Sequence, residues 1–264
     1  MDLLLKEKLA LVSGSTAGIG LAIAEGLARE SATVIVNGRS EPRVANAIEM
    51  IRQKYPGSQV KGFAGDLSTV EGFDLLKNEY PDVDILVNNL GIFNPQPFGE
   101  ISDEEWRRFF EVNVLSGVRL SRYYLPRMKD KGWGRIVFIS SESAIQIPVE
   151  MIHYGCTKTA QLAISRGLAE STVGTGVTVN AVLPGPTASE GVSDFVAKLA
   201  AQTKQSASEF EEYFFEKVRP TSLLKRFATS EEVANMVVYI CSPLASATNG
   251  ASLRVDGGVV RTIV

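Results

Sequence analysis

Lys8-Leu-Ala-Leu-Val-Ser-Gly-Ser-Thr-Ala-Gly-Ile-Gly20 sets the architecture of this chain. Its apolar start is followed by a loop in which Gly14, Gly18 and Gly20 have the spacing G-x-x-x-G-x-G, and then by an amphipathic segment to Arg29. This order predicts a strand, a glycine loop and a helix. Small residues let the backbone approach a pyrophosphate, whose charge a helix N-terminus favours. The stretch therefore predicts a nucleotide-binding loop, although glycines also end strands without binding a ligand.

Apolar runs alternate with helical segments along the rest of the chain. Further strands are expected at Thr33–Asn37, Val60–Ala64, Asp84–Val87, Arg135–Ile139, Val177–Leu183 and near Leu253. No internal repeat or Pro/Ser/Gly-rich linker interrupts the alternation. Six or seven strands alternating with helices predict an α/β fold of the Rossmann type, a doubly wound parallel sheet with helices on both faces. Residues 1–264 are expected to form this single domain.

Two longer segments carry helix signals. A capping box at Ser102 predicts a helix to about Tyr124, which Pro126 would end. Residues 188–228 form a polar and helical insertion after the strand that ends at Leu183. An insertion at the carboxyl end of a strand is placed to be a substrate lid. Its aromatic side chains either pack into the core or form a wall of the substrate site.

Composition excludes several classes of function. The chain has 264 residues, 45% of them apolar, and a net charge of −3. Since no basic stripe is present, no nucleic-acid partner is expected. No apolar run approaches the roughly 18 residues that span a bilayer, and the N-terminus lacks the pattern of a signal peptide. The two cysteines, Cys156 and Cys241, suggest neither a metal site nor a disulfide. We therefore expect a cytoplasmic protein without a metal or membrane partner.

The end of the second strand indicates which dinucleotide binds. An acid at this position would bind a free ribose 2′-hydroxyl, whereas an arginine accommodates a 2′-phosphate. The chain has no acid at 37–39 but has Arg39 there, with Arg43 nearby. Guanidinium can grip phosphate bidentately, so NADP(H) is favoured over NAD(H), unless Arg39 only caps a loop. Asp66, after the third strand, is expected to accept from the adenine amino group, to cap the next helix, or both.

The stretch from Ser141 to Lys158 carries candidate chemistry. Ser141 follows an expected strand, and Tyr154 and Lys158 are four residues apart, so they share a helix face. Lowering the pKa of a phenol from about 10 to about 7 takes about 4 kcal/mol. At an effective dielectric constant of about 20, the attraction between an ammonium and a phenolate about 4 Å away contributes roughly this much free energy. Lys158 is thus able to tune Tyr154 for proton transfer, although the two residues can share a helix face by chance.

Taken together, these motifs resemble those of the short-chain dehydrogenase/reductase family over nearly the whole chain. Ser13–Gly20 resembles the family's T-G-x-x-x-G-I-G loop, with Ser13 in place of Thr. Residues 88–91, Asn-Asn-Leu-Gly, resemble N-N-A-G, with a bulkier Leu90. Pro184-Gly185 resembles the P-G that opens onto the nicotinamide, and residues 256–258 resemble the C-terminal turn.

The resemblance implies roles for individual residues. Tyr154 would be the acid/base and Ser141 would polarise the substrate oxygen. Lys158 would lower the pKa of Tyr154 and bind the nicotinamide ribose, and Asn113 would hold a water in a proton relay to Lys158. The cofactor site would comprise Gly14, Ser15, Thr16, Gly18, Ile19, Gly20, Arg39, Asp66, Leu67, Asn89, Gly91, Tyr154, Lys158, Pro184, Gly185 and Thr187.

The resemblance leaves the substrate open. We rank an NADP-dependent oxidoreductase acting on a small carbonyl compound or secondary alcohol first, and a 3-oxoacyl-thioester (acyl-carrier) reductase second. The second would need a basic docking patch, for which Arg122, Arg127, Lys129 and Lys131 are candidates. A catalytically silent NADP-binding sensor is the alternative from another class, although both Tyr154 and Lys158 are present. The resemblance also implies a homotetramer.

Overall fold

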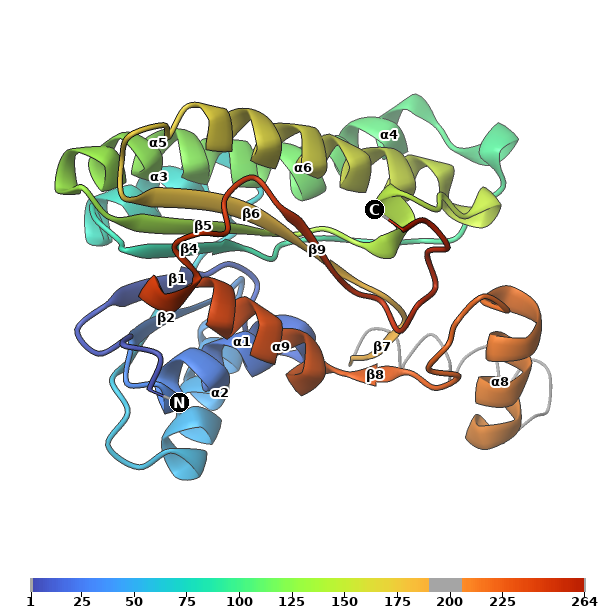
Figure 1. Cartoon of the computed structure of the whole chain (residues 1–264), viewed down its shortest axis with the longest axis horizontal. Helices are drawn as coiled ribbons and strands as arrows, with labels where there is room; N and C mark the ends of the chain where they lie inside the picture. The colour runs from blue at the N-terminus through green and yellow to red at the C-terminus, as the bar shows by residue number, and fades with distance from the viewer. Residues whose placement is uncertain (1, 190–205, 264) are drawn as a thin grey trace.

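Seven parallel strands form one sheet in the computed structural model, which describes residues 2–189 and 206–263 (Figure 1). The strand order is β3-β2-β1-β4-β5-β6-β9, and every neighbouring pair is parallel. The strands are β1 (Leu9–Val12), β2 (Thr33–Gly38), β3 (Val60–Ala64), β4 (Ile85–Asn88), β5 (Gly134–Ile139), β6 (Val177–Pro184) and β9 (Ser252–Val255). The order reverses between β1 and β4, which is where open α/β sheets form their ligand crevice.

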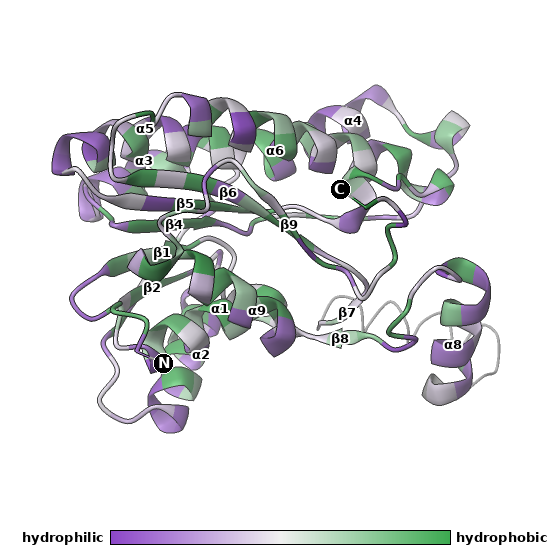
Figure 2. Cartoon of the chain, viewed as in Figure 1, coloured by the Kyte–Doolittle hydropathy of each residue, from purple (hydrophilic) through white to green (hydrophobic). Residues whose placement is uncertain are grey.

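Helices cover both faces of this sheet (Figure 1). Side chains of α1 (Gly18–Arg29), α2 (Glu41–Lys54) and α9 (Ser230–Ile240) pack into one core cluster. Side chains of α3 (Val70–Glu79), α5 (Ser116–Lys131) and α6 (Ile152–Glu170) pack into another on the opposite face. The central strands are mostly hydrophobic, whereas the helices mix both kinds of residue (Figure 2). A strand that is buried on both faces has this continuous apolar pattern.

Successive side chains of β1 alternate between the two core clusters. Ala10 and Val12 belong to the cluster with α1, and Leu11 belongs to the cluster with α5. Successive side chains of a strand point to opposite faces, so each buried strand joins the two layers. The predicted fold class is therefore confirmed.

The helix after Ser102 differs from its prediction. It runs as α4 (Asp103–Phe110), a π-helical turn at Glu111–Leu115, and α5. Pro126 lies inside α5, so the prediction that it ends the helix is wrong. A proline removes one N–H, but Leu125 and Met128 beside it are buried against the sheet and hold the last turns in place. The helix ends instead at Gly132, which has a left-handed φ of 71°.

Short elements connect these layers. They are η1 (Phe98–Glu100), η3 (Glu142–Ala144), η4 (Val149–Met151), α8 (Ala207–Tyr213), a π-helical turn at Phe214–Val218 and η6 (Pro243–Ala245). A second, two-stranded parallel sheet pairs β7 (Thr187–Ala188) with β8 (Ala228–Thr229). This pairing brings together the two ends of the predicted lid insertion, whose residues 190–205 lie outside the described part of the chain. Within the described ranges, no helix has the length and apolar character needed to cross a bilayer.

Candidate active site

A cavity of about 600 Å³ opens beyond the carboxyl ends of the central strands. Of the predicted site residues, it is lined by Ile19, Asn89, Gly91, Ser141, Tyr154, Lys158, Pro184, Gly185 and Thr187. Phe93, Phe210, Phe214 and Phe227 add an aromatic wall. The cavity therefore brings Ser141, Tyr154 and Lys158, three of the four predicted catalytic residues, together with one end of the predicted cofactor site.

The glycine loop between β1 and α1 is shaped by close backbone packing. Gly14 and Gly18 have left-handed φ values of 62° and 55°, which favour glycine. A Cβ on Gly20 would lie 2.4 Å from the Gly14 carbonyl oxygen. The Asn89 amide holds the loop from β4 by donating to the Ser13 and Gly14 carbonyl oxygens, at 3.0 Å each. Asn89 therefore braces the glycine loop against the end of β4.

The start of α1 is suited to bind an anion. Its N-cap is Ala17, whose side chain makes no capping hydrogen bond. The first N–H groups of a helix have no partner within the helix, and the helix dipole favours negative charge beside them. Ile19, in this first turn, lines the cavity. A pyrophosphate between the loop and the cavity would meet these N–H groups.

Two predicted cofactor residues have structural roles that limit their contact with a ligand. Ser15 is fully buried, and its hydroxyl donates to the Val12 carbonyl at 2.7 Å and accepts from Asn37 N–H. Leu67 is 1% exposed and belongs to the core. Thr16, the neighbour of Ser15, packs against Gly38. A Cβ added to Gly38 would lie 2.5 Å from the methyl group of Thr16. The side chains of Ser15 and Leu67 therefore support the cradle from below, whereas Thr16 is half-buried at its surface.

The predicted adenosine end of the site is formed where β2 and β3 end. Arg39 is exposed directly after β2, and Gly38 is paired with Ala64, two residues before Asp66. The Asp66 carboxylate accepts from both the N–H and the hydroxyl of Ser68. Since Thr69 provides the N-cap of α3, the prediction that Asp66 caps this helix is wrong. Arg39 remains placed for a phosphate on the adenosine ribose.

The predicted catalytic side chains Ser141, Tyr154 and Lys158 come from the segment after β5 and from α6. Ser141 follows the end of β5 and caps η3, because its hydroxyl accepts from Ser143 N–H at 3.1 Å. Tyr154 and Lys158 lie one turn apart on α6, with the Lys158 ammonium 5.6 Å from the centre of the Tyr154 ring. Lys158 Nζ also donates to the Ile139 carbonyl at 2.9 Å. The predicted shared helix face is thus observed.

The electrostatics of this pair differ from the prediction. Burial raises the pKa of Tyr154, an effect opposed by the Ser141 hydroxyl and Arg219 and increased by Glu142. Burial also lowers the pKa of Lys158 to about 7. The predicted lowering of the pKa of Tyr154 is therefore wrong for this structure, because desolvation of the buried phenol outweighs the opposing effects of the Ser141 hydroxyl and Arg219.

Asn113 lies in the π-helical turn and is 1% exposed. Its side-chain amide donates to Ile92 O and Thr157 Oγ1, both at 3.0 Å, and its oxygen accepts from Ile92 N–H at 2.7 Å. Its backbone carbonyl accepts from the Gln161 side chain at 2.5 Å. These protein contacts use both amide hydrogens of Asn113, so the side chain braces the loop after β4 and has no N–H left for a water.

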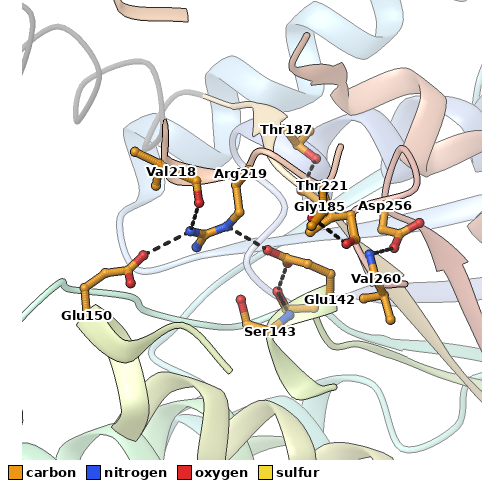
Figure 3. A network of polar contacts seen from close by, with 12 residues as sticks. Glu142, Ser143, Glu150, Gly185, Thr187, Val218, Arg219, Thr221, Asp256 and Val260 are labelled. Carbon is orange, nitrogen blue, oxygen red and sulfur yellow. Dashed lines mark hydrogen bonds and ion pairs between the residues drawn. The ribbon is translucent and has the colours of Figure 1, made fainter. Parts of the chain in front are cut away.

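Sequence reasoning missed a charged cluster at the cavity, which Figure 3 shows. The Ser141 hydroxyl donates to Glu142 at 2.6 Å. The Arg219 Nε lies 3.6 Å from Glu142, and Arg219 Nη1 lies 3.1 Å from Glu150. Glu142 directly follows Ser141 in the sequence, and that adjacency is the one signal that pointed to it. Nothing in the sequence connects Arg219 with this region.

Comparisons with known proteins agree with this geometry. Residues 14–260 match a family model described as Enoyl-(Acyl carrier protein) reductase. The uncharacterized oxidoreductase YvaG of Bacillus subtilis (strain 168) is 51% identical over 263 residues, which cover 100% of each chain. The 3-oxoacyl-[acyl-carrier-protein] reductase FabG of Aquifex aeolicus (strain VF5) is 35% identical, covering 98% of this chain and 100% of its own.

Solved structures lead to the same family. L-sorbose reductase from Gluconobacter frateurii, solved in complex with NADPH and L-sorbose, superposes with a TM-score of 0.93. It is 32% identical to this chain, and the match covers 100% of both chains. These matches agree with the order of the strands, the glycine loop and the arrangement of Ser141, Tyr154 and Lys158. The chain therefore belongs to the short-chain dehydrogenase/reductase family of oxidoreductases.

Proposed function

We propose that this protein is an NADP(H)-dependent oxidoreductase that interconverts a small carbonyl compound and its secondary alcohol. The observation that carries the proposal is a single cavity that Ser141, Tyr154 and Lys158 line together with Ile19 and Pro184. Proton-transfer groups thus lie beside the start of α1, where a dinucleotide phosphate would bind. L-sorbose reductase, the relative solved with NADPH, carries out carbonyl chemistry of this kind.

The residues present suit the cofactor. The glycine cradle and the uncapped start of α1 would hold the pyrophosphate, and Arg39 would bind the 2′-phosphate of NADP(H). Asn89, Gly91, Pro184, Gly185 and Thr187 would border its nicotinamide end. When bound, this group supplies or accepts the hydride. NAD(H) is the alternative cofactor if Arg39 makes no phosphate contact.

Residues of the chain would supply the proton that the substrate oxygen receives. A raised pKa keeps the Tyr154 phenol protonated at neutral pH, which is the form that donates a proton to a carbonyl oxygen. Ser141 would hold the same oxygen, and Lys158 would bind the cofactor ribose. Asn113 would act indirectly, since its contacts fix both the loop at Ile92 and the α6 residue Thr157.

A 3-oxoacyl-thioester reductase is the second candidate, and the 35% identity to the Aquifex aeolicus enzyme favours it. The proposed docking patch argues against it. Lys131 pairs with Asp84 at 2.8 Å, and Arg127 stacks on Tyr123 at 3.8 Å. The patch lies on α5, which ends just before β5 begins. Ser141 follows the other end of β5, so the patch and Ser141 lie toward opposite ends of this strand. None of the four basic residues lines the cavity, so a carrier bound there would dock away from Ser141.

Three further features belong to the proposal. The predicted lid at 188–228 would close the substrate side, because Phe210, Tyr213 and Phe214 from its described part line the cavity. A homotetramer would form through the long helices around 103–124 and 154–171, and light scattering of the purified protein would measure its mass. A cytoplasmic location stays a prediction from composition, which cell fractionation would test.

The decisive experiment is NADPH oxidation with a panel of ketones and aldehydes, using wild type and Tyr154→Phe. Loss of the phenolic proton donor should lower kcat by about 10²–10⁴-fold while NADPH affinity is retained. Tyr239→Phe, an exposed position on α9, is the matched control. Equal turnover by wild type and Tyr154→Phe would refute the proposed role of Tyr154. A wild type that binds NADPH but reduces no carbonyl compound would favour the sensor alternative.

A further inference from the structure

The Ser141 hydroxyl is held by the side chain that follows it. It donates to Glu142 Oε2 at 2.6 Å, while the Ser143 N–H donates to Ser141 Oγ at 3.1 Å. Glu142 is 5% exposed and lines the same cavity. A hydroxyl has one hydrogen and two lone pairs. The contact to Glu142 therefore decides whether that hydrogen is available to a substrate.

The position of Glu142 is itself fixed by Arg219 (Figure 3). The Arg219 side chain is 11% exposed, with its Nε 3.6 Å from Glu142 Oε1. Its Nη1 lies 3.1 Å from Glu150 and donates to the Val218 carbonyl at 3.0 Å. Arg219 therefore connects η3, which follows Ser141, with η4, which precedes Tyr154. Glu150 belongs to the same cluster but makes no described contact with Ser141.

The hydrogen bond between Ser141 and Glu142 has two states, which differ in whether the Glu142 carboxyl carries a proton. When Glu142 is ionised, the Ser141 hydrogen lies on the bond to the carboxylate, and Ser141 offers the cavity a lone pair. When Glu142 is neutral, its own O–H can donate to Ser141 Oγ, and the Ser141 hydrogen is available to a carbonyl oxygen. No proton leaves Ser141 in either state. The two states therefore differ in their ability to polarise a carbonyl group.

Resting on the proposed function, we propose that Glu142 is a positioning residue that sets the direction of the Ser141 hydroxyl hydrogen bond. In its neutral form, Glu142 directs the Ser141 hydrogen to the carbonyl oxygen of the substrate and supports reduction. In its ionised form, Glu142 removes that hydrogen from the substrate. Arg219 holds the Glu142 side chain in reach of Ser141 in both forms.

The groups around Glu142 determine where it titrates. In the described residues these are Arg219, the Tyr154 phenol, and the Ser141 and Ser143 donors, with Glu150 reached through Arg219. Burial raises the pKa of Glu142, and the Ser141 contact and Arg219 oppose that rise. The neutral form is thus favoured at a higher pH than for an exposed glutamate. The kcat/KM of carbonyl reduction should fall as pH rises through this pKa.

The test is the pH profile of kcat/KM for NADPH-dependent carbonyl reduction by wild type and variants. Glu142→Gln keeps a neutral N–H donor toward Ser141, so it should retain the low-pH activity within about threefold and lose the fall that Glu142 causes. Glu142→Leu should lower kcat/KM by about 10–100-fold. Tyr239→Phe, at an exposed position on α9, is the matched control and should leave the position of that fall unchanged. A Glu142→Gln profile with the wild-type fall would overturn the proposal.

A double-mutant cycle separates positioning from a general structural effect. In a Ser141→Ala background, Glu142→Leu should cause no further loss of kcat/KM, because there is no hydroxyl to orient. A further loss equal to that in wild type would contradict the proposal. NADPH affinity and thermal unfolding of each variant show whether the fold is kept.

A spectroscopic readout needs no turnover. In wild type, one infrared band of a protonated carboxyl group should persist at a higher pH than the bands of exposed carboxyl groups; it should be absent in Glu142→Gln and shifted in Ser141→Ala. If the band is missing, this proposal fails even when carbonyl reduction is observed. If the band is present but no carbonyl compound is reduced, the proposed function fails and the hydrogen-bond assignment stands.

Discussion

The Lys158 ammonium lies 5.6 Å from the centre of the Tyr154 ring and donates to the Ile139 carbonyl at 2.9 Å. Lys158 is 4% exposed, and this burial brings its pKa to about 7. Neither the contact with Ile139 nor the proximity of Tyr154 offsets the loss of hydration. An unfavourable buried charge is thus built into the wall of the candidate active site, as is common where such a site needs a tuned group.

Lys158→Met should stabilise the protein while reducing its activity. An unfolded lysine keeps its proton up to about pH 10.5, whereas folded Lys158 loses its proton near pH 7. Between these values the unfolded state binds more protons, so the free energy of unfolding of wild type rises with pH. The gain from Lys158→Met should be up to about 4 kcal/mol at pH 7 and should vanish near pH 10.5.

Urea denaturation of Lys158→Met at several pH values measures this gain. Lys61→Met, at an exposed position on β3, is the control for loss of a surface charge. A gain that stays constant between pH 7 and pH 10.5 would show that Lys158 carries no buried charge in the folded protein.

Arg39→Ala should change cofactor preference. Arg39 is exposed directly after β2, and no acid at 37–39 is present to bind a free 2′-hydroxyl. Its loss should weaken NADPH binding by about 10–100-fold, the usual size of a lost charge-assisted phosphate contact, and leave NADH binding unchanged. Fluorescence titration with both cofactors measures this, with Arg166→Ala on the exposed face of α6 as control. Tighter NADH binding by wild type would refute the phosphate role of Arg39.

Gly20→Ala should damage the cofactor cradle. The added Cβ would lie 2.4 Å from the Gly14 carbonyl oxygen and 2.5 Å from Asn89 Nδ2. Because backbone atoms cannot move aside cheaply, we expect a loss of about 1–3 kcal/mol in the free energy of unfolding and weaker NADPH binding. Gly167→Ala, in an exposed turn of α6 with open space around it, should instead stabilise by about 0.5–1 kcal/mol. Thermal unfolding of both variants provides the comparison.

The parallel sheet was readable from the sequence because its strands are buried on both faces. A continuous apolar run such as Val34–Val36, followed by a turn and a helical pattern, depends on local residues alone. The positions of Ser141 and Tyr154 followed from the same pattern, since a strand end and a helix start determine them. Local signals of this kind carry most of the fold and the outline of the site.

What the sequence could not predict depends on burial and on distant partners. The spacing of Tyr154 and Lys158 indicates attraction, but the cost of desolvating both appears only in the folded protein. Pro126 reads as a helix end until the packing of its neighbours against the sheet is known. Arg219 reaches Glu142 across a part of the chain without any recognisable motif. Each of these features is set by tertiary contacts that no local pattern encodes.

His153→Leu should stabilise the protein, most strongly at low pH. His153 is fully buried beside Phe109, with ring centres 4.1 Å apart, and neither ring nitrogen has a hydrogen-bond partner among the described residues. Burial lowers its pKa, Glu105 opposes this and Arg108 adds to it. The unfolded state therefore binds a proton near pH 6.5 that the folded state binds only at lower pH, so stability falls as pH falls below that value. Leucine removes this pH dependence and also the cost of the two unpaired nitrogens, which is about 1–3 kcal/mol.

His153→Asn, which keeps an uncharged polar group, should lose the pH dependence without the full gain in stability. Urea unfolding between pH 5 and pH 8 separates the two effects, and equal pH slopes in wild type and His153→Leu would exclude titration of His153 as their cause.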